Sequence, residues 1–227
     1  MSKIEKAYII RISSELSRQY AKDVSKSCEK INLPFEFFNG TEQKSGYDAW
    51  NQSGLDFKPL GLYKSNKTDK AACASVSHAL LWKKIYENKE TAIILEHDGH
   101  MLQPVNELNI PDNMIVVLGY KLTDPSKYDH KRAGKPKTIK IIDGHEGAHA
   151  YAITWKTAGV LLNELKEIGV NSPVDNKFFL KMRETKVTIG IADPTPAIGW
   201  IRQSTIWPEA ATLNYEFIES FKNNVFL

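Results

Sequence analysis

The sequence predicts an α/β fold with a mostly parallel central sheet flanked by helices. Short runs of β-branched and aliphatic residues recur along the chain, and segments with apolar residues at helical spacing separate them. Gly, Pro or Asn stands at many of the boundaries. Strands that alternate with helices in this way are typical of a layered domain with a parallel sheet. The length suits one domain, so we expect residues 1–227 to form a single unit.

The chain is predicted to begin with a strand, a helix and a second strand. Residues 7–12 form an apolar run that predicts the first strand. Ser13 or Ser14 is expected to cap a helix with one apolar face. Residues 35–38 predict the next strand. The polar stretch 41–66 contains glycine and dispersed aromatic residues, which favour a long loop acting as an ordered lid.

The alternation continues to the end of the chain. A helix is expected from Thr68 or Asp69 to about Glu87, where helical spacing of apolar residues ends. Later strands are predicted over residues 92–95, 113–119, 138–142, 149–153 and 186–191. Later helices are predicted after residue 153, ending at Gly169, and over residues 173–182.

The stretch Thr91–His100 carries the clearest signal for a site. The apolar run Ala92–Leu95 stops abruptly at Glu96-His97-Asp98. Ligands of open α/β sheets gather at the carboxyl ends of the strands. Two acids one residue apart at such an end can bind one divalent cation, which can hold phosphates. Strand-end carboxylates also cap helices, pair with lysines or solubilise turns, so both interpretations stay open here.

Composition narrows the class of protein. The hydrophobic and charged fractions are ordinary for a soluble globular protein. No apolar run reaches membrane-spanning length, and the N-terminus lacks the apolar core of a signal peptide, so a cytoplasmic location without a transmembrane segment is expected. Cys28 and Cys73 are predicted to be small buried hydrophobic residues. The motifs of dinucleotide-binding folds, phosphate loops and serine hydrolases are absent from the sequence.

Two clusters of residue types admit more than one interpretation. His145 and His149 are four residues apart, but they stand beside glycines and cysteine ligands are lacking, so a zinc site has little support. The segment Lys121–Lys140 holds seven lysines and arginines against two aspartates. It is either a solvated loop or a surface for phosphate-bearing substrates. The candidate acceptor-binding residues in this segment are Lys127, Lys131, Arg132 and Lys135.

Three motifs follow one another in a specific order. They are Ser77-His-Ala-Leu-Leu-Trp82 on a predicted helix, the strand that ends at Glu96-His97-Asp98, and Gly147-Ala-His-Ala-Tyr151 before an amphipathic helix. These motifs and their order resemble those of glycosyltransferase family 25, which includes lipooligosaccharide and collagen galactosyltransferases. Weaker matches extend the resemblance over nearly the whole chain, at Arg18, Pro173-Val-Asp175 and Gln203-Ser-Thr-Ile206.

The resemblance implies a GT-A fold, a nucleotide-sugar donor (typically a UDP-sugar) and Mn²⁺ or Mg²⁺. The chain departs from the family pattern at His97, where the family has aspartate, and at Arg11, where it has asparagine. The implied donor-binding residues are Arg11, Arg18, Ser77, His78, Glu96 and His149. The implied metal ligands are Asp98, Glu96 and His97.

The chemistry of sugar transfer suggests what each candidate site residue would do. Negative charge develops on the departing nucleotide diphosphate, and a divalent ion held by Asp98 would stabilise it. Inverting transfer needs a carboxylate that deprotonates the acceptor hydroxyl, and Asp175 is the candidate through its proline–aspartate match, with a helix cap as the alternative. Ser77 and His78 could instead tie their helix to the central strand. His149 and Tyr151 could line the pocket, and Tyr151 could equally be a core residue.

The acceptor and the class of activity stay open at this stage. A surface glycan is one acceptor, and a hydroxymethylated base in phage DNA is the other. The basic segment suits DNA phosphates through counterion release, and it suits lipid or lipopolysaccharide phosphates equally well. A duplex base would first have to be flipped out of the stack. A non-catalytic nucleotide-sugar or carbohydrate-binding protein of the same fold is the alternative class, which the altered Glu96-His97-Asp98 permits.

Overall fold

The structure is a computed structural model that describes residues 2–56, 66–122, 134–145, 147–168 and 186–200. Its helices are α1 (Glu15–Lys30), α2 (Gly46–Ser53), α3 (Asn66–Asn88) and α4 (Trp155–Ile168). Its strands are β1 (Ser2–Lys3), β2 (Lys6–Arg11), β3 (Phe35–Asn39), β4 (Thr91–Leu95), β5 (Gly99–Met101), β6 (Asn109–Ile110), β7 (Met114–Val117), β8 (Gly119–Leu122), β9 (Thr138–Ile141), β10 (Ala150–Thr154), β11 (Thr188–Asp193) and β12 (Ala197–Trp200).

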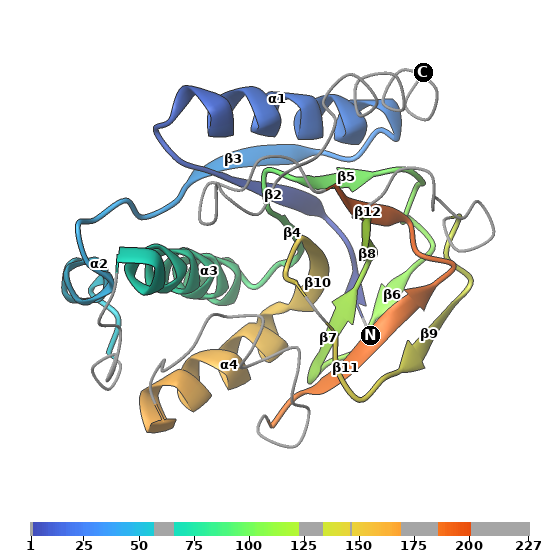
Figure 1. Ribbon diagram of the computed structural model, residues 1–227. Helices are drawn as coiled ribbons and strands as arrows, with labels where there is room; N and C mark the ends of the chain where they lie inside the picture. The colour runs from blue at the N-terminus through green and yellow to red at the C-terminus, as the bar shows by residue number, and fades with distance from the viewer. Residues whose placement is uncertain (1, 57–65, 123–133, 146, 169–185, 201–227) are drawn as a thin grey trace.

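The described strands form a seven-stranded sheet in the order β3-β2-β4-β10-β7-β11-β9, a three-stranded sheet in the order β5-β12-β8, and the pair β1-β6. Helices flank the large sheet, which confirms the predicted α/β fold (Figure 1). The large sheet is mixed, however, and not mostly parallel as the sequence suggested. β2 runs parallel to β3 and β4, and β7 runs parallel to β11. β10 lies antiparallel between β4 and β7, and the edge strand β9 is antiparallel to β11.

The two faces of the large sheet bury separate apolar clusters. Successive side chains of a strand point to opposite faces. Tyr8, Ile94 and Tyr151 therefore pack with residues of α3 and α4. Their neighbours Ile9 and Ile93 pack with residues of α1. Figure 1 shows α1 on one side of the sheet and α3 and α4 on the other. Every residue of β4 and β10 is buried, as expected for central strands covered on both faces.

The first helix begins as its sequence indicates. Of the two predicted capping residues, Ser14 is the N-cap, and its hydroxyl accepts a hydrogen bond from the Ser17 backbone N–H. The buried face of α1 includes Tyr20, Val24 and Cys28. Both cysteines, Cys28 and Cys73, are buried and free, as predicted.

The stretch predicted as a loop contains a short helix. α2 is capped by Ser45, whose hydroxyl accepts from the Asp48 N–H, and it ends at Gly54 in the left-handed conformation. Gly46 brings α2 close to α3, since a Cβ at this position would lie 2.2 Å from the Ala72 Cβ. A helix of eight residues offers too few turns for a periodic pattern, so the capping serine and the glycine were its main signals.

Some predictions fall on residues outside the described part of the chain. They concern Gly169, the helix over residues 173–182, Asp175, the Gln203 motif, Lys127, Lys131 and Arg132. Within the described residues, no helix combines the length and the apolar character that crossing a membrane requires.

Candidate active site

The pairing of β4 with β10 assembles the site. β10 runs antiparallel to β4, with Ala150 opposite Leu95, so the start of β10 meets the end of β4. The hydrogen-bond ladder extends one residue further, because the Glu96 N–H donates to the His149 carbonyl at 2.9 Å. The chain then turns, and the Gly99 N–H donates to the Glu96 carbonyl at 2.9 Å. Residues distant in sequence thus become neighbours at the carboxyl end of β4.

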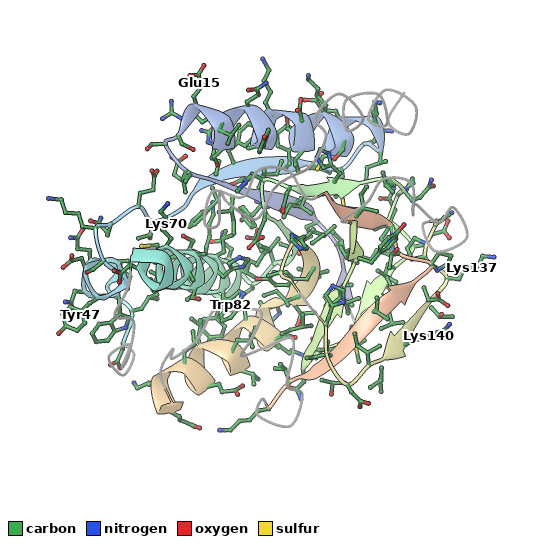
Figure 2. All side chains as sticks on the ribbon, viewed as in Figure 1. Glu15, Tyr47, Lys70, Trp82, Lys137 and Lys140 are labelled. Atoms are coloured by element: carbon green, nitrogen blue, oxygen red, sulfur yellow. The ribbon has the colours of Figure 1, made fainter. Side chains whose placement is uncertain are left out.

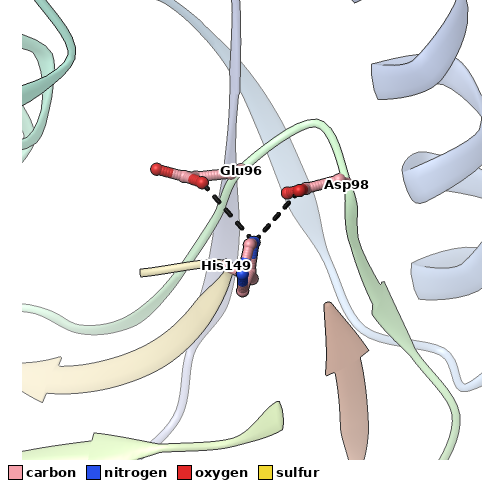
Figure 3. Close-up of side chains that lie close together, drawn as sticks. All are labelled: Glu96, Asp98 and His149. Atoms are coloured by element: carbon pink, nitrogen blue, oxygen red, sulfur yellow. Dashed lines mark ion pairs between the residues drawn. The ribbon is translucent and has the colours of Figure 1, made fainter. Parts of the chain in front are cut away.

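Three side chains converge at this end. Figure 3 shows Glu96 and Asp98 on the loop after β4, with His149 opposite them. His149 Nδ1 lies 3.0 Å from Asp98 Oδ2 and 3.7 Å from Glu96 Oε2. One ligand atom from each of the three residues lies within 4.8 Å of the others, and among the described residues this is the one such cluster. The Glu96 and Asp98 side chains are 27% and 19% exposed, so the cluster is open to solvent on one side.

Asp98 has an oxygen that the protein itself does not satisfy. Its Oδ1 is buried, and no hydrogen-bond partner for it is present among the described residues. A buried carboxylate oxygen without a partner is costly. A cation bound between the two carboxylates would supply the missing interaction. The residues of the cluster therefore fit a divalent cation.

Both carboxyls titrate below their ordinary values. For Asp98, burial raises the pKa, but the charge of His149, its hydrogen bond and the charges of neighbouring histidines lower the pKa to about 2. For Glu96, burial raises the pKa, while the hydrogen bond of His78 and the charges of His78 and His149 outweigh it, so the pKa is lowered. Both groups are therefore ionised at neutral pH.

Acid denaturation of the metal-free protein tests this electrostatic assignment. Because the pKa of Asp98 falls from 3.8 to about 2 on folding, its stabilisation is complete above its ordinary pKa and lost as the pH falls through the folded value. The shift corresponds to about 2 kcal/mol. From about pH 4 to about pH 2, the wild-type protein should lose about 2 kcal/mol more free energy of unfolding than Asp98→Asn, measured by urea denaturation. Equal losses would contradict the assignment.

Glycines surround the His149 side chain. A Cβ on Gly147, where φ is +85°, would lie 2.4 Å from His149 Nε2. A Cβ on Gly199, in β12, would lie 2.5 Å from His149 Cδ2. A Cβ on Gly99 would lie 2.1 Å from the His149 carbonyl oxygen. Gly147 and Gly199 thus leave open the space that the imidazole occupies, whereas Gly99 lets the turn after β4 approach the His149 backbone.

The structure places His97 outside this cluster. Its ring stacks on Tyr20 of α1, with ring centroids 6.0 Å apart. In the turn after β4, Glu96 reaches His78 of α3 while His97 faces α1. His149, predicted as a donor-binding residue, takes the position beside the carboxylates that was expected of His97.

Ser77 and His78 are both buried in α3. The Ser77 hydroxyl accepts from the Thr41 N–H at 2.8 Å and donates to the Cys73 carbonyl at 2.8 Å, so it ties α3 to the loop after β3. His78 is 1% exposed, and its Nε2 lies 3.1 Å from Glu96 Oε1. His78 therefore acts on the site through Glu96.

The two arginines predicted to bind the donor have different surroundings. Arg11 ends β2, and the register of β2 with β4, with Ile9 opposite Leu95, places it at the same edge of the sheet as Glu96. Its guanidinium lies 4.3 Å from the centroid of the Phe37 ring and donates to the Asn39 side chain. Arg18 lies exposed on α1.

The described part of the basic segment is partly neutralised. Lys135 pairs with Glu107 at 2.7 Å, and Lys140 pairs with Asp193 at 2.5 Å. Figure 2 shows Lys137 and Lys140 at the outer rim of the molecule, beside β9. These lysines lie on the surface, and acidic neighbours reduce the positive potential that they present.

An α/β fold with paired carboxylates and an imidazole at a strand end is typical of enzymes that handle phosphate-bearing substrates through a cation. The family model described as glycosyltransferase family 25 (LPS biosynthesis protein) matches residues 4–178. The match spans most of the chain, so the protein belongs to glycosyltransferase family 25 and is a glycosyltransferase.

Other comparisons are more distant. No curated protein sequence matches the chain. Among solved structures, the galactosyltransferase LgtC, crystallised with donor and acceptor sugar analogues, matches with a TM-score of 0.40 and 11% sequence identity. That match covers 97% of this chain and 96% of the other. A likeness this remote says nothing about individual residues, and the family assignment depends on the family model alone.

Proposed function

We propose that the protein transfers a sugar from a UDP-sugar to a hydroxyl of a glycan acceptor, with a divalent cation held by Glu96, Asp98 and His149. The observation that carries the proposal is the convergence of three ligand atoms within 4.8 Å at the carboxyl end of β4. Family membership supplies the reaction class. The cluster supplies a place where a nucleotide diphosphate can be held.

The ligand set favours Mn²⁺ over Mg²⁺. Mg²⁺ is usually bound through oxygen atoms and retained waters. An imidazole beside two carboxylates suits a first-row transition ion better. The buried Oδ1 of Asp98 lacks a hydrogen-bond partner among the described residues, and a bound cation would satisfy it. When bound, the cation would act as a Lewis acid and stabilise the negative charge of the departing diphosphate.

The residues of the chain position the donor. Glu96 and Asp98 are ionised at neutral pH and would repel a diphosphate by themselves, so a bound cation is needed to reverse the local potential. Arg11 adds a fixed positive group at the same sheet edge, since Phe37 and Asn39 hold its guanidinium. We assign Arg11 to donor binding on this basis.

We further propose an inverting mechanism with Asp175 as the base that deprotonates the acceptor hydroxyl. The support is the match of Asp175 to the proline–aspartate motif of the family. Asp175→Asn should lower kcat by roughly 100-fold or more while the KM for the donor changes little, because general-base catalysis contributes roughly 10²–10⁴-fold. Steady-state kinetics with saturating acceptor measures both constants. A raised donor KM with unchanged kcat would instead place Asp175 in donor binding.

The family description supports a lipopolysaccharide glycan as the acceptor. The ion pairs of Lys135 and Lys140 leave less free positive charge for a DNA backbone than the sequence of the segment suggests. Hydroxymethylated DNA therefore enters as the second acceptor in the test below.

A transfer assay with a panel of UDP-sugars tests the proposal. Each donor is supplied with Mn²⁺ or with a chelator, against lipooligosaccharide and against hydroxymethylated DNA, and added hexose or pentose is detected by mass spectrometry. We expect Mn²⁺-dependent transfer to the glycan from one donor. Transfer to DNA would correct the acceptor, transfer that persists in chelator would correct the cation, and no transfer from any donor would contradict the proposal.

A further inference from the structure

A histidine that is itself almost fully buried holds Glu96. His78 Nε2 lies 3.1 Å from Glu96 Oε1. On the other side of the ring, Nδ1 lies 2.8 Å from the Tyr151 hydroxyl, and the two rings are nearly parallel. Both ring nitrogens are therefore engaged inside the protein. A side chain with 1% exposure has no surface to offer a substrate, so its influence passes through Glu96.

The hydrogen bonds continue to Trp82, four residues after His78 on α3. This spacing puts both side chains on one face of the helix. Trp82 Nε1 donates to the Tyr151 hydroxyl at 2.9 Å. An indole N–H can only donate, so the hydroxyl oxygen accepts this bond. The hydroxyl can then donate its proton to His78 Nδ1, which lies 2.8 Å away.

The donor–acceptor direction of these hydrogen bonds fixes the tautomer of His78. When Nδ1 accepts from Tyr151, a neutral ring carries its proton on Nε2 and donates it to Glu96. The two oxygens of Glu96 then differ. Oε1 is held by His78, whereas Oε2 lies on the side of His149, 3.7 Å from its Nδ1.

We propose that Trp82, Tyr151 and His78 form a positioning relay that fixes the Glu96 carboxylate for cation binding. This inference rests on the proposed function, in which Glu96 is a cation ligand. A flexible glutamate loses rotamer freedom when it binds an ion, and a buried partner that already orients it reduces this loss. Partners that orient a ligating side chain typically alter metal affinity by roughly 10- to 100-fold. His78 is thus a positioning residue and does not contact the donor.

The tautomer of His78 tests the relay without any metal. At about pH 8, ¹⁵N spectra of histidine-labelled protein show which ring nitrogen of His78 carries the proton. We expect His78, assigned with a His78→Gln sample, to have its proton on Nε2, and Tyr151→Phe to weaken that preference, because Glu96 alone then selects the tautomer. A proton on Nδ1 in the wild-type protein would overturn the relay, whether or not the protein binds a cation.

Titration of the metal-free protein with Mn²⁺, followed by calorimetry, tests what the relay does. Tyr151→Phe and His78→Leu should each raise the Kd roughly 10- to 100-fold. His78→Gln should fall between His78→Leu and wild type, because its amide nitrogen can donate from near the position of Nε2. Tyr8→Phe is the matched control. Tyr8 is equally buried, and its hydroxyl donates to a carboxylate, Glu90, that lies outside the cation cluster.

The outcomes separate the relay from the proposed site. If Glu96→Gln loses affinity for Mn²⁺ while Tyr151→Phe and His78→Leu bind like wild type, the cation site stands and the relay is wrong. If Glu96→Gln also binds like wild type, the proposed site is wrong. Should Tyr151→Phe fail to fold because the Trp82 N–H is left unsatisfied, the double variant Trp82→Phe with Tyr151→Phe removes both partners and permits the same measurement.

Discussion

Asp98→Asn is expected to lower transfer activity by about a thousandfold, or about 4 kcal/mol of transition-state stabilisation. Asparagine has the shape of aspartate without its charge. The change removes a ligand from the proposed cation site and the partner that lies 3.0 Å from His149 Nδ1. The electrostatic support for charge on the departing diphosphate would be lost with it. Because asparagine fills the same volume and can still accept hydrogen bonds, we expect the fold to persist.

The matched control for this substitution is Asp112→Asn. Asp112 also has a lowered pKa and an ion pair, with Lys156 at 2.9 Å, but it does not belong to the cation cluster. Initial rates with saturating UDP-sugar and Mn²⁺ should show the loss in Asp98→Asn alone, and circular dichroism should show the same fold in both. Asp98→Asn with activity near that of the control would remove Asp98 from the mechanism.

Gly99→Ala is expected both to destabilise the protein and to abolish cation binding. The added Cβ would lie 2.1 Å from the His149 carbonyl oxygen and 3.0 Å from its carbonyl carbon. Backbone cannot rotate out of such a contact, so the turn after β4 or the start of β10 must move. Overpacking of this kind typically costs about 1–3 kcal/mol. The movement also breaks the register that brings His149 to Glu96 and Asp98.

Gly199→Ala provides a graded comparison. Here the added Cβ would meet the imidazole of His149, 2.5 Å from Cδ2 and 2.6 Å from Cγ, and not its backbone. We expect Gly199→Ala to weaken Mn²⁺ binding with a smaller loss of stability than Gly99→Ala. Urea denaturation and Mn²⁺ titration of both variants measure the two effects. Gly99→Ala with wild-type stability and affinity would show that the close approach of β5 to His149 is not required.

The sequence was sufficient to find the acidic end of β4. An apolar run that stops at a polar cluster is a local signal, and the burial of all five residues of β4 agrees with it. The alternation of strands and helices likewise predicted the layered fold. The direction of β10 was not predictable, because its apolar residues suit a parallel and an antiparallel neighbour equally. That direction alone decides that His149, at the start of β10, meets the end of β4.

The set of cation ligands could not be predicted for the same reason, because it depends on the direction of β10. The resemblance to the family implied that Glu96, His97 and Asp98 act together as metal ligands. The turn after β4 places His97 against α1 instead, where its ring stacks on Tyr20. The glycines around His149 were visible in the sequence as Gly99, Gly147 and Gly199. That all three lie against His149 became apparent only in the structure, where β12 pairs with β5 and the start of β10 meets the end of β4.

The most direct measurement is a crystal structure of the protein with Mn²⁺ and an unreactive UDP-sugar analogue, with the ion located by its anomalous scattering. We expect the anomalous peak between Glu96, Asp98 and His149, with the diphosphate of the analogue bound to the same ion. A peak elsewhere, with Asp98 and His149 still paired to each other and the analogue bound away from β4, would contradict the account.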